Sequence, residues 1–189
     1  MKYYPKLITS WKSVFTNSEL KSFLWISNNA ALNNILQTMK KNNLINNPCY
    51  GIRTLDNYDK IELATKIRFP SYVSFETILQ KYWIIYQNYQ HTIMLAWNNT
   101  LKKTIDWITI EYHKLKPSIL TNPLWLNYTW KYFEATQERA VCDMAYLYKN
   151  INFDRIDWLD LAYLSEISEI YPKSTYLLIK KLIKNAQSR

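Results

Sequence analysis

Glycine is the residue whose scarcity most constrains this chain. Gly51 is the single glycine among 189 residues. The phosphate loops of P-loop NTPases and of dinucleotide-binding folds need several glycines at fixed spacing, because the backbone must turn tightly and approach the phosphate closely. The sequence therefore excludes both classes of fold, and we expect no cofactor.

The remaining composition is that of a folded protein without a metal site. Hydrophobic residues make up 48% of the chain and aromatic residues 16%, which is enough for a core and argues against disorder. Cys49, Cys142, His91 and His113 are isolated in the sequence, so neither a disulfide framework nor a zinc site is expected. The uncharged stretch 82–101 contains Asn, Gln and His side chains that are costly in lipid. We expect no membrane span, no signal peptide and a cytoplasmic location.

The net charge of +9 is concentrated at the two ends of the chain. Residues 1–60 carry eight Lys/Arg against three Asp/Glu, residues 61–172 carry eleven against twelve, and residues 173–189 carry five against none. A basic N-terminal segment is typical of a protein that binds a polyanion. A solvated, lysine-rich surface would explain the same distribution.

The N-terminal segment has the pattern of two consecutive helices. Thr16 and Glu19 have the spacing of a capping box at the start of a short helix, and Ser27 is a candidate N-cap for the next one. Residues 28–41 then follow a helical period, with an apolar stripe of Ala31, Leu32, Ile35, Leu36 and Met39.

A β-hairpin is expected after the second helix. The apolar runs 44–45 and 49–55 flank a polar turn that contains Pro48. Two helices followed by a hairpin predict a winged helix-turn-helix domain over residues 1–58, which ends in the polar linker 56–60.

Residues 59–189 mix helical and strand patterns, so the predicted fold class is α+β: an N-terminal winged helix-turn-helix followed by a C-terminal mixed α+β domain. Helices are expected near residues 61–67, 75–86, 136–148, 158–165 and 173–186, and strands near 92–96 and 103–114. The alternation of Ile, Trp, Thr and Tyr in the last of these predicts one strand.

Three segments appear in an order shared with a known family. They are the helix-turn-helix and hairpin of residues 15–55, the run that begins Phe69-Pro70-Ser71-Tyr72-Val73-Ser74-Phe75-Glu76, and the helix start Thr136-Gln137-Glu138-Arg139 that continues to Asp143. Over nearly the whole chain the sequence resembles the AbiEi-type antitoxins and transcriptional regulators of type IV toxin–antitoxin systems. The residues that match the family motifs, for which we expect structural roles, are Pro70, Ser71, Tyr72, Ser74, Glu76, Glu138, Arg139 and Asp143.

The resemblance implies a repressor that binds double-stranded DNA at its own promoter. It also implies an antitoxin that counters a nucleotidyltransferase-like toxin without a stable complex. Three alternatives stay open: a solitary winged-helix regulator whose C-terminal domain senses a partner or ligand, an enzyme such as a nuclease, and a protein-interaction module.

The second helix of the helix-turn-helix is the candidate DNA reader, because the N-terminal residues of that helix meet base edges in the major groove. Asn and Gln can form paired hydrogen bonds with adenine, and Lys favours phosphates. The amides therefore suggest an operator with A·T pairs, and Arg53 on the hairpin is a candidate phosphate or minor-groove contact. The candidate set is Asn28, Asn29, Asn33, Asn34, Gln37, Lys40, Lys41 and Arg53. A solvated helix face is the alternative interpretation.

No catalytic site is expected. Asp106, Glu111 and Lys114 are spaced unlike the residues of a nuclease, and strand alternation would place the two carboxylates on opposite faces. Arg139 and Asp143 lie one helical turn apart, and we expect them to hold their helix against segment 70–76. Trp125 and Trp130 are candidates for an exposed partner surface.

Overall fold

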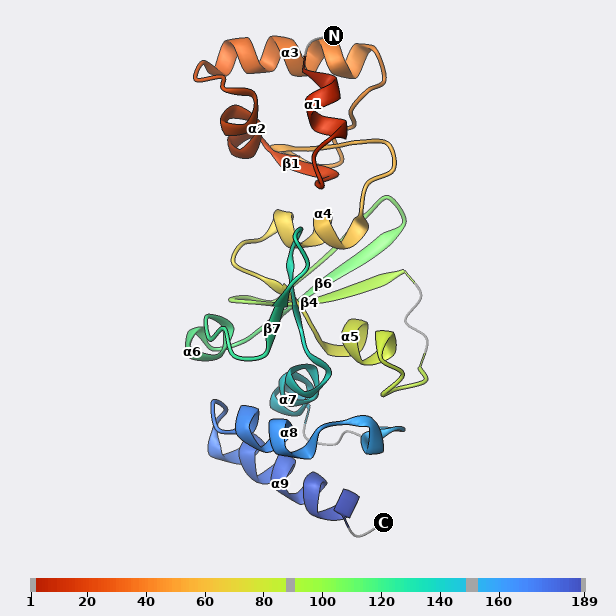
Figure 1. Cartoon of the computed structure of the whole chain (residues 1–189), viewed down its shortest axis with the longest axis vertical. Coiled ribbons are helices and arrows are strands. Elements are labelled where there is room, and N and C mark those ends of the chain that lie inside the picture. Colours follow the sequence, from red (N-terminus) through yellow and green to blue (C-terminus); the bar gives the residue numbers. More distant parts are fainter. Residues whose placement is uncertain (1–2, 88–90, 149–152, 188–189) are drawn as a thin grey trace. The chain divides into compact units, whose positions relative to one another are not determined.

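The computed structural model describes residues 3–87, 91–148 and 153–187 (Figure 1). The chain divides into two compact units, Met1–Phe69 and Pro70–Arg189. The sequence placed the boundary at residues 58 and 59, which is one helix earlier. Helix α4 (Lys60–Ile67) belongs to the first unit because Glu62, which is fully buried, accepts hydrogen bonds from the backbone and the hydroxyl group of Ser13.

In its described residues, 3–69, the first unit contains a small two-stranded sheet and four helices. Its elements are α1 (Tyr4–Ile8), β1 (Val14–Thr16), α2 (Asn17–Leu24), α3 (Asn29–Lys41), β2 (Ile52–Thr54) and α4. Strands β1 and β2 are antiparallel, and Asn46 forms an isolated bridge with Thr54. The core is formed by Leu7, Phe15, Leu20, Leu24, Leu32, Leu36, Met39 and Ile45.

Local signals determine where α2 and α3 begin. The predicted capping box of α2 is confirmed: the Thr16 hydroxyl accepts the Glu19 N–H, and the Glu19 carboxylate accepts the Thr16 N–H. The N-cap of α3 is Asn28, whose side chain accepts the Ala30 N–H, and not Ser27. In the expected apolar stripe of α3, Leu32, Leu36 and Met39 are buried, whereas Ala31 is exposed and Ile35 is half-buried.

The expected hairpin over residues 44–55 is only partly formed. Its first arm contributes the single bridge at Asn46, and β2 has β1 as its main partner. Gly51 lies in the turn before β2 with a φ of 76°, a conformation that favours glycine. The pairing was missed because β1 precedes β2 by two helices, and such a long-range contact leaves no local pattern.

The second unit is built on a six-stranded sheet in the order β5-β6-β4-β3-β8-β7. The strands are β3 (Tyr72–Val73), β4 (Thr92–Trp97), β5 (Leu101–Ile105), β6 (Ile108–Lys114), β7 (Leu126–Tyr128) and β8 (Phe133–Ala135). Pairs β4–β6 and β3–β8 are parallel, and the other neighbours are antiparallel. This mixed sheet with its helices confirms the α+β class.

The helices of the second unit are α5 (Phe75–Lys81), α6 (Pro117–Leu120), α7 (Gln137–Leu147), the 3₁₀ turn η1 (Ile156–Trp158), α8 (Leu161–Ser168) and α9 (Lys173–Gln187). Helix α7 contacts α5, α8 and α9 (Figure 1). Within the described residues, no helix combines the length and the hydrophobicity needed to cross a bilayer.

Three local predictions in the second unit were wrong. The strand expected over residues 103–114 is the hairpin β5–β6, and its turn contains Asp106 and Trp107, both with positive φ. A two-residue turn preserves the alternation of side chains, so the pattern could not reveal the reversal of the chain. The helix expected to reach residue 86 ends at Lys81, and the helix expected at 158–165 begins at Leu161, after the 3₁₀ turn.

Candidate functional site

Helix α3 separates its apolar and polar side chains cleanly. Leu32, Leu36 and Met39 are buried in the core of the first unit. The predicted polar residues are all exposed, namely Asn28, Asn29, Asn33, Asn34, Gln37, Lys40 and Lys41. The polar face is therefore open to a ligand, and substitutions on it would leave the core of the unit intact.

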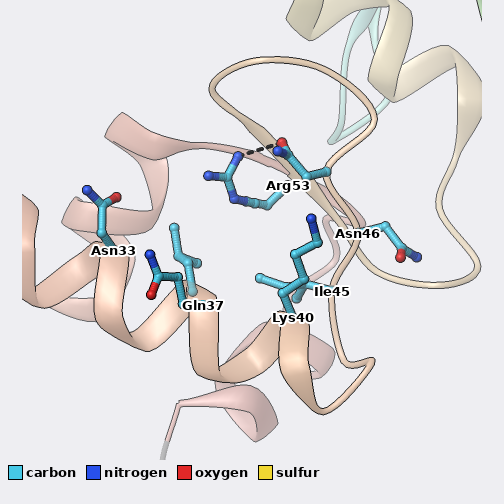
Figure 2. A pocket seen from close by; sticks show the side chains of 8 residues that line it. Asn33, Gln37, Lys40, Ile45, Asn46 and Arg53 are labelled. Carbon is cyan, nitrogen blue, oxygen red and sulfur yellow. Dashed lines mark hydrogen bonds between the residues drawn. The ribbon is translucent and has the colours of Figure 1, made fainter.

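A groove of about 220 Å³ runs between α3 and the segment that follows it (Figure 2). Figure 2 shows Asn33, Gln37 and Lys40 projecting from α3 on the side where Arg53 lies. The lining consists of Asn33, Leu36, Gln37, Lys40, Ile45, Asn46, Asn47 and Arg53. Two of these eight side chains are cations and none is a carboxylate, so the groove is suited to an anionic ligand.

Arg53 is held in a defined position at this groove. Its Nη1 donates to Asn47 Oδ1 at 2.7 Å and to the Ile52 carbonyl at 3.0 Å. The side chain is half-buried, and this burial lowers the pKa of the guanidinium below its ordinary value. Neither hydrogen-bond partner carries a charge, so the cation is partly desolvated without a carboxylate to balance it.

The structure brings together half of the predicted DNA-binding set. Asn33, Gln37, Lys40 and Arg53 line the same groove. The other four residues are exposed but lie outside its lining: Asn28, Asn29, Asn34 and Lys41. Asn28 also uses its side-chain oxygen for the N-cap of α3.

Sequence reasoning missed Asn46 and Asn47, which also line the groove. They stand before Pro48 in a polar stretch that has the composition of a turn. The neighbouring asparagines, Asn42 and Asn43, do not line the groove. Composition alone could not separate Asn46 and Asn47 from these.

A cluster of charged groups around Glu19 joins helices α2 and α4 of the first unit. Burial opposes the ionisation of Glu19, but hydrogen bonds from Lys66, the Thr16 N–H and Lys12 outweigh it and lower the pKa of Glu19 to about 2. Glu19 lies on α2 and Lys66 on α4, so the ionised carboxylate ties these two helices together.

Four of the family-motif residues, Tyr72, Ser74, Arg139 and Asp143, meet in a buried polar cluster. Arg139 and Asp143 on α7 have fully buried side chains 3.6 Å apart. Asp143 accepts hydrogen bonds from the hydroxyl groups of Tyr72, Ser74 and Tyr171. Helix α7 is therefore bonded directly to the segment that contains Tyr72 and Ser74.

Arg139 also secures the chain between α6 and β7. Its guanidinium donates to the Ile119 carbonyl at 2.7 Å, to the Leu124 carbonyl at 2.8 Å and to the Tyr72 hydroxyl at 3.0 Å. Burial opposes its charge, but the attraction of Asp143, together with the contributions of Tyr171 and Tyr72, outweighs burial and raises the pKa of Arg139. Burial also raises the pKa of Tyr72 and Tyr171, which keeps both phenols protonated as donors. These contacts bind protein groups to one another, and Arg139 and Asp143 are closed to solvent.

The other motif residues are more dispersed. Pro70 is exposed and Ser71 is half-buried. Glu138 accepts the Asp160 N–H and a bond from Gln137. Glu76 is buried at the start of α5, and burial, followed by the nearby Glu111, raises the pKa of its carboxyl group. Tyr171, which completes the cluster around Asp143, was missed because no sequence motif marks it.

The carboxylates considered for a nuclease do not converge. Asp106 lies in the β5–β6 turn, and Glu111 on β6 forms an ion pair with Lys102 at 2.7 Å. In the part of the chain that the structure describes, no group of three His, Cys, Asp or Glu side chains could hold a metal ion.

The two candidate tryptophans have different surroundings. Trp130 is 79% exposed, whereas Trp125 is half-buried and its ring lies 4.3 Å from that of Tyr163. Trp130 therefore remains a candidate for contact with a partner. The sequence matches no protein-family model and no curated protein, so the AbiEi resemblance rests on the three motifs.

Proposed function

We propose that the first unit is a winged helix that binds double-stranded DNA, and that the protein represses its own promoter and acts as an antitoxin. The observation that carries the DNA-binding proposal is the groove beside α3, where Asn33 and Gln37 lie with the cations of Lys40 and Arg53. Amides at the groove supply base recognition, and cations supply attraction to phosphates.

The winged-helix assignment is supported by the order of elements. Helix α1 is followed by β1, the helices α2 and α3, and β2, which pairs with β1. Winged helices have this order, and in the proposal α3 is the recognition helix. The residues between Asn46 and Arg53 correspond to the wing.

The charge of the first unit agrees with this proposal. Residues 1–69 carry ten Lys/Arg against four Asp/Glu, and residues 70–189 carry fourteen against eleven. Glu62 is buried, and Glu19 is engaged by Lys12 and Lys66, so the acidic groups of this unit are partly used internally. A cationic unit with an exposed polar helix has the electrostatic character of a DNA-binding domain.

The antitoxin role is supported by the resemblance alone. In that proposal the second unit counters a nucleotidyltransferase-like toxin without a stable complex. Helix α7, which carries Glu138, Arg139 and Asp143, belongs to the structural centre of this unit.

A solitary regulator that senses a protein partner is the second candidate. It is favoured by the exposed aromatic surface on the β7–β8 hairpin, where the Tyr128 ring lies 6.2 Å from Trp130 and 5.0 Å from Phe133. Exposed aromatic groups of this kind mark protein-interaction sites.

The test measures binding to the DNA upstream of the protein's own gene. Fluorescence anisotropy should show specific binding, and Asn33→Ala and Gln37→Ala should each weaken it by about 1–3 kcal/mol, the range for a lost base contact. Asn185→Ala, an exposed amide on α9, is the matched control and should change nothing.

If Asn33→Ala and Gln37→Ala both bind the operator as tightly as the wild type, α3 is not the reader. Protection of cells against a toxin encoded beside this gene separates the antitoxin from the solitary regulator.

A further inference from the structure

We propose that the groove beside α3 contains a phosphate site in which Arg53 and Lys40 hold one phosphate group. This inference rests on the proposed function, because the site lies on the surface assigned to DNA. Two sources share the chemistry: a phosphodiester of the DNA backbone, and the phosphate monoester of a free nucleotide.

The first argument is the unbalanced charge of the groove. Arg53 and Lys40 both line it, and none of the eight lining residues is acidic. The acidic residue Asp56 accepts a hydrogen bond from Asn46 Nδ2 at 3.0 Å but does not itself line the groove. A partly desolvated cation without a counter-ion is costly, and an anion from outside the protein removes that cost.

The second argument is the preorganisation of the guanidinium. Both hydrogen bonds of Arg53 use Nη1, with Asn47 and Ile52 as the acceptors. The Nη2 and Nε donors of the fork are left for a ligand. An arginine whose orientation is fixed loses little entropy when it binds, and its fork matches two oxygens of a phosphate.

The third argument is size. A cavity volume of about 10–15 Å³ suffices for one water molecule, so a groove of about 220 Å³ has room for a phosphate group. The amides of Asn33 and Gln37 line the same groove and can bond to hydroxyl groups or base edges. Any free phosphate ester in this site would compete with DNA for the same residues.

The experiment uses the full chain and four variants. Arg53→Gln removes the charge, Arg53→Lys keeps the charge without the fork, and Asn47→Ala removes the group that orients Arg53. Arg155→Gln is the matched control, an arginine of the second unit stacked on Trp158. The DNA arm measures binding to operator and random DNA over a range of salt concentrations. The ligand arm titrates inorganic phosphate and adenosine monophosphate by calorimetry.

We expect Arg53→Gln to weaken binding to both DNA sequences by roughly tenfold. The slope of log K against log salt should become shallower by about one unit. Arg53→Lys should restore the slope but not the full affinity, and Asn47→Ala should weaken binding with the slope intact. If the variants change DNA binding in this way and no nucleotide binds, the phosphate that occupies the site belongs to the DNA backbone. Arg53-dependent binding of adenosine monophosphate that displaces DNA identifies the free phosphate ester.

The two proposals fail in different ways. If Asn33→Ala and Gln37→Ala weaken operator binding while Arg53→Gln changes neither affinity nor slope and no phosphate binds, the phosphate site is refuted and the DNA reader stands. If no DNA binds but adenosine monophosphate binds and Arg53→Gln abolishes it, the DNA-binding function is refuted and the phosphate site stands.

Discussion

Replacing Arg139 with methionine tests how strongly the buried polar cluster stabilises the second unit. The substitution keeps an unbranched side chain in place. It removes the hydrogen bonds to the carbonyls of Ile119 and Leu124 and to the hydroxyl of Tyr72, and leaves Asp143 buried without its cation. Breaking a buried ion pair on one side costs about 3–5 kcal/mol. The second unit has 120 residues, and a domain of that size has a total stability of about 6–18 kcal/mol.

Urea unfolding, followed by tryptophan fluorescence and far-ultraviolet circular dichroism, measures the loss. Arg139→Met should lower the urea midpoint, and Asp143→Asn should lower it as well. The double variant should lose less than the sum of the two, with a coupling free energy of about 0.5–3 kcal/mol, because the residues share one network. Arg155→Met, at a partly exposed arginine that stacks on Trp158 and pairs with Asp157, should cost no more than about 1 kcal/mol.

A loss below about 1 kcal/mol for Arg139→Met would refute this reasoning, because it is the range of a solvent-exposed pair. DNA binding by the first unit should be unchanged in the same variant. A variant as stable as the wild type that binds DNA but no longer protects against the toxin would make Arg139 a functional residue of the antitoxin instead.

The first unit offers three further tests. The pKa of Glu19 is about 2 in the folded protein against 4.5 as the ordinary value, so its ionised form stabilises the fold above about pH 4.5 and that contribution is lost as the pH falls towards 2. After allowance for the partial exposure of Glu19, this contribution is about 1–2 kcal/mol. The melting temperature of Glu19→Gln should therefore fall less steeply than that of the wild type as the pH is lowered; an equal fall in both proteins would contradict this. Asn28→Ala should destabilise α3 by about 1 kcal/mol in urea titrations because it removes the N-cap, and no change would show that water replaces the cap. Lys40→Ala and Lys41→Ala should each make the salt slope of DNA binding shallower by about one unit, whereas an unchanged slope would mean that these lysines are merely solvated.

The features that could be predicted from the sequence are those with local causes. The capping box at Thr16 and Glu19, the helical period of α3, and α7 starting after Thr136 all depend on residues within one or two turns of each other. The pairing of β1 with β2 joins strands that are separated by two helices, and the tight β5–β6 turn leaves the alternation of side chains unchanged, so neither could be predicted.

In the candidate site, too, the features with local causes could be predicted and the contacts formed by folding could not. The polar face of α3 follows from the spacing of its apolar residues, so its exposed amides were predicted. Asn47 lines the groove together with Arg53 of β2, whose Nη1 donates to Asn47 Oδ1 at 2.7 Å. Likewise Tyr171 meets Asp143 through the packing of the C-terminal helices on α7. Neither contact has a signal in the spacing of residues along the chain.

The parallel pairing of β3 with β8 in the large sheet has a consequence for synthesis on the ribosome. Val73 of β3 pairs with Glu134 of β8, and Asp143 must then follow to engage Tyr72 and Ser74. The first unit is complete once residue 69 has left the exit tunnel, because its most distant hydrogen bonds, such as Ser13 to Glu62, lie within it. Domains fold as units during translation, at about 5–20 residues per second. The first unit can thus fold seconds before β3 pairs with β8. Throughout that interval the nascent protein carries a folded first unit and an incomplete sheet in the second unit, whose unpaired strand edge is exposed.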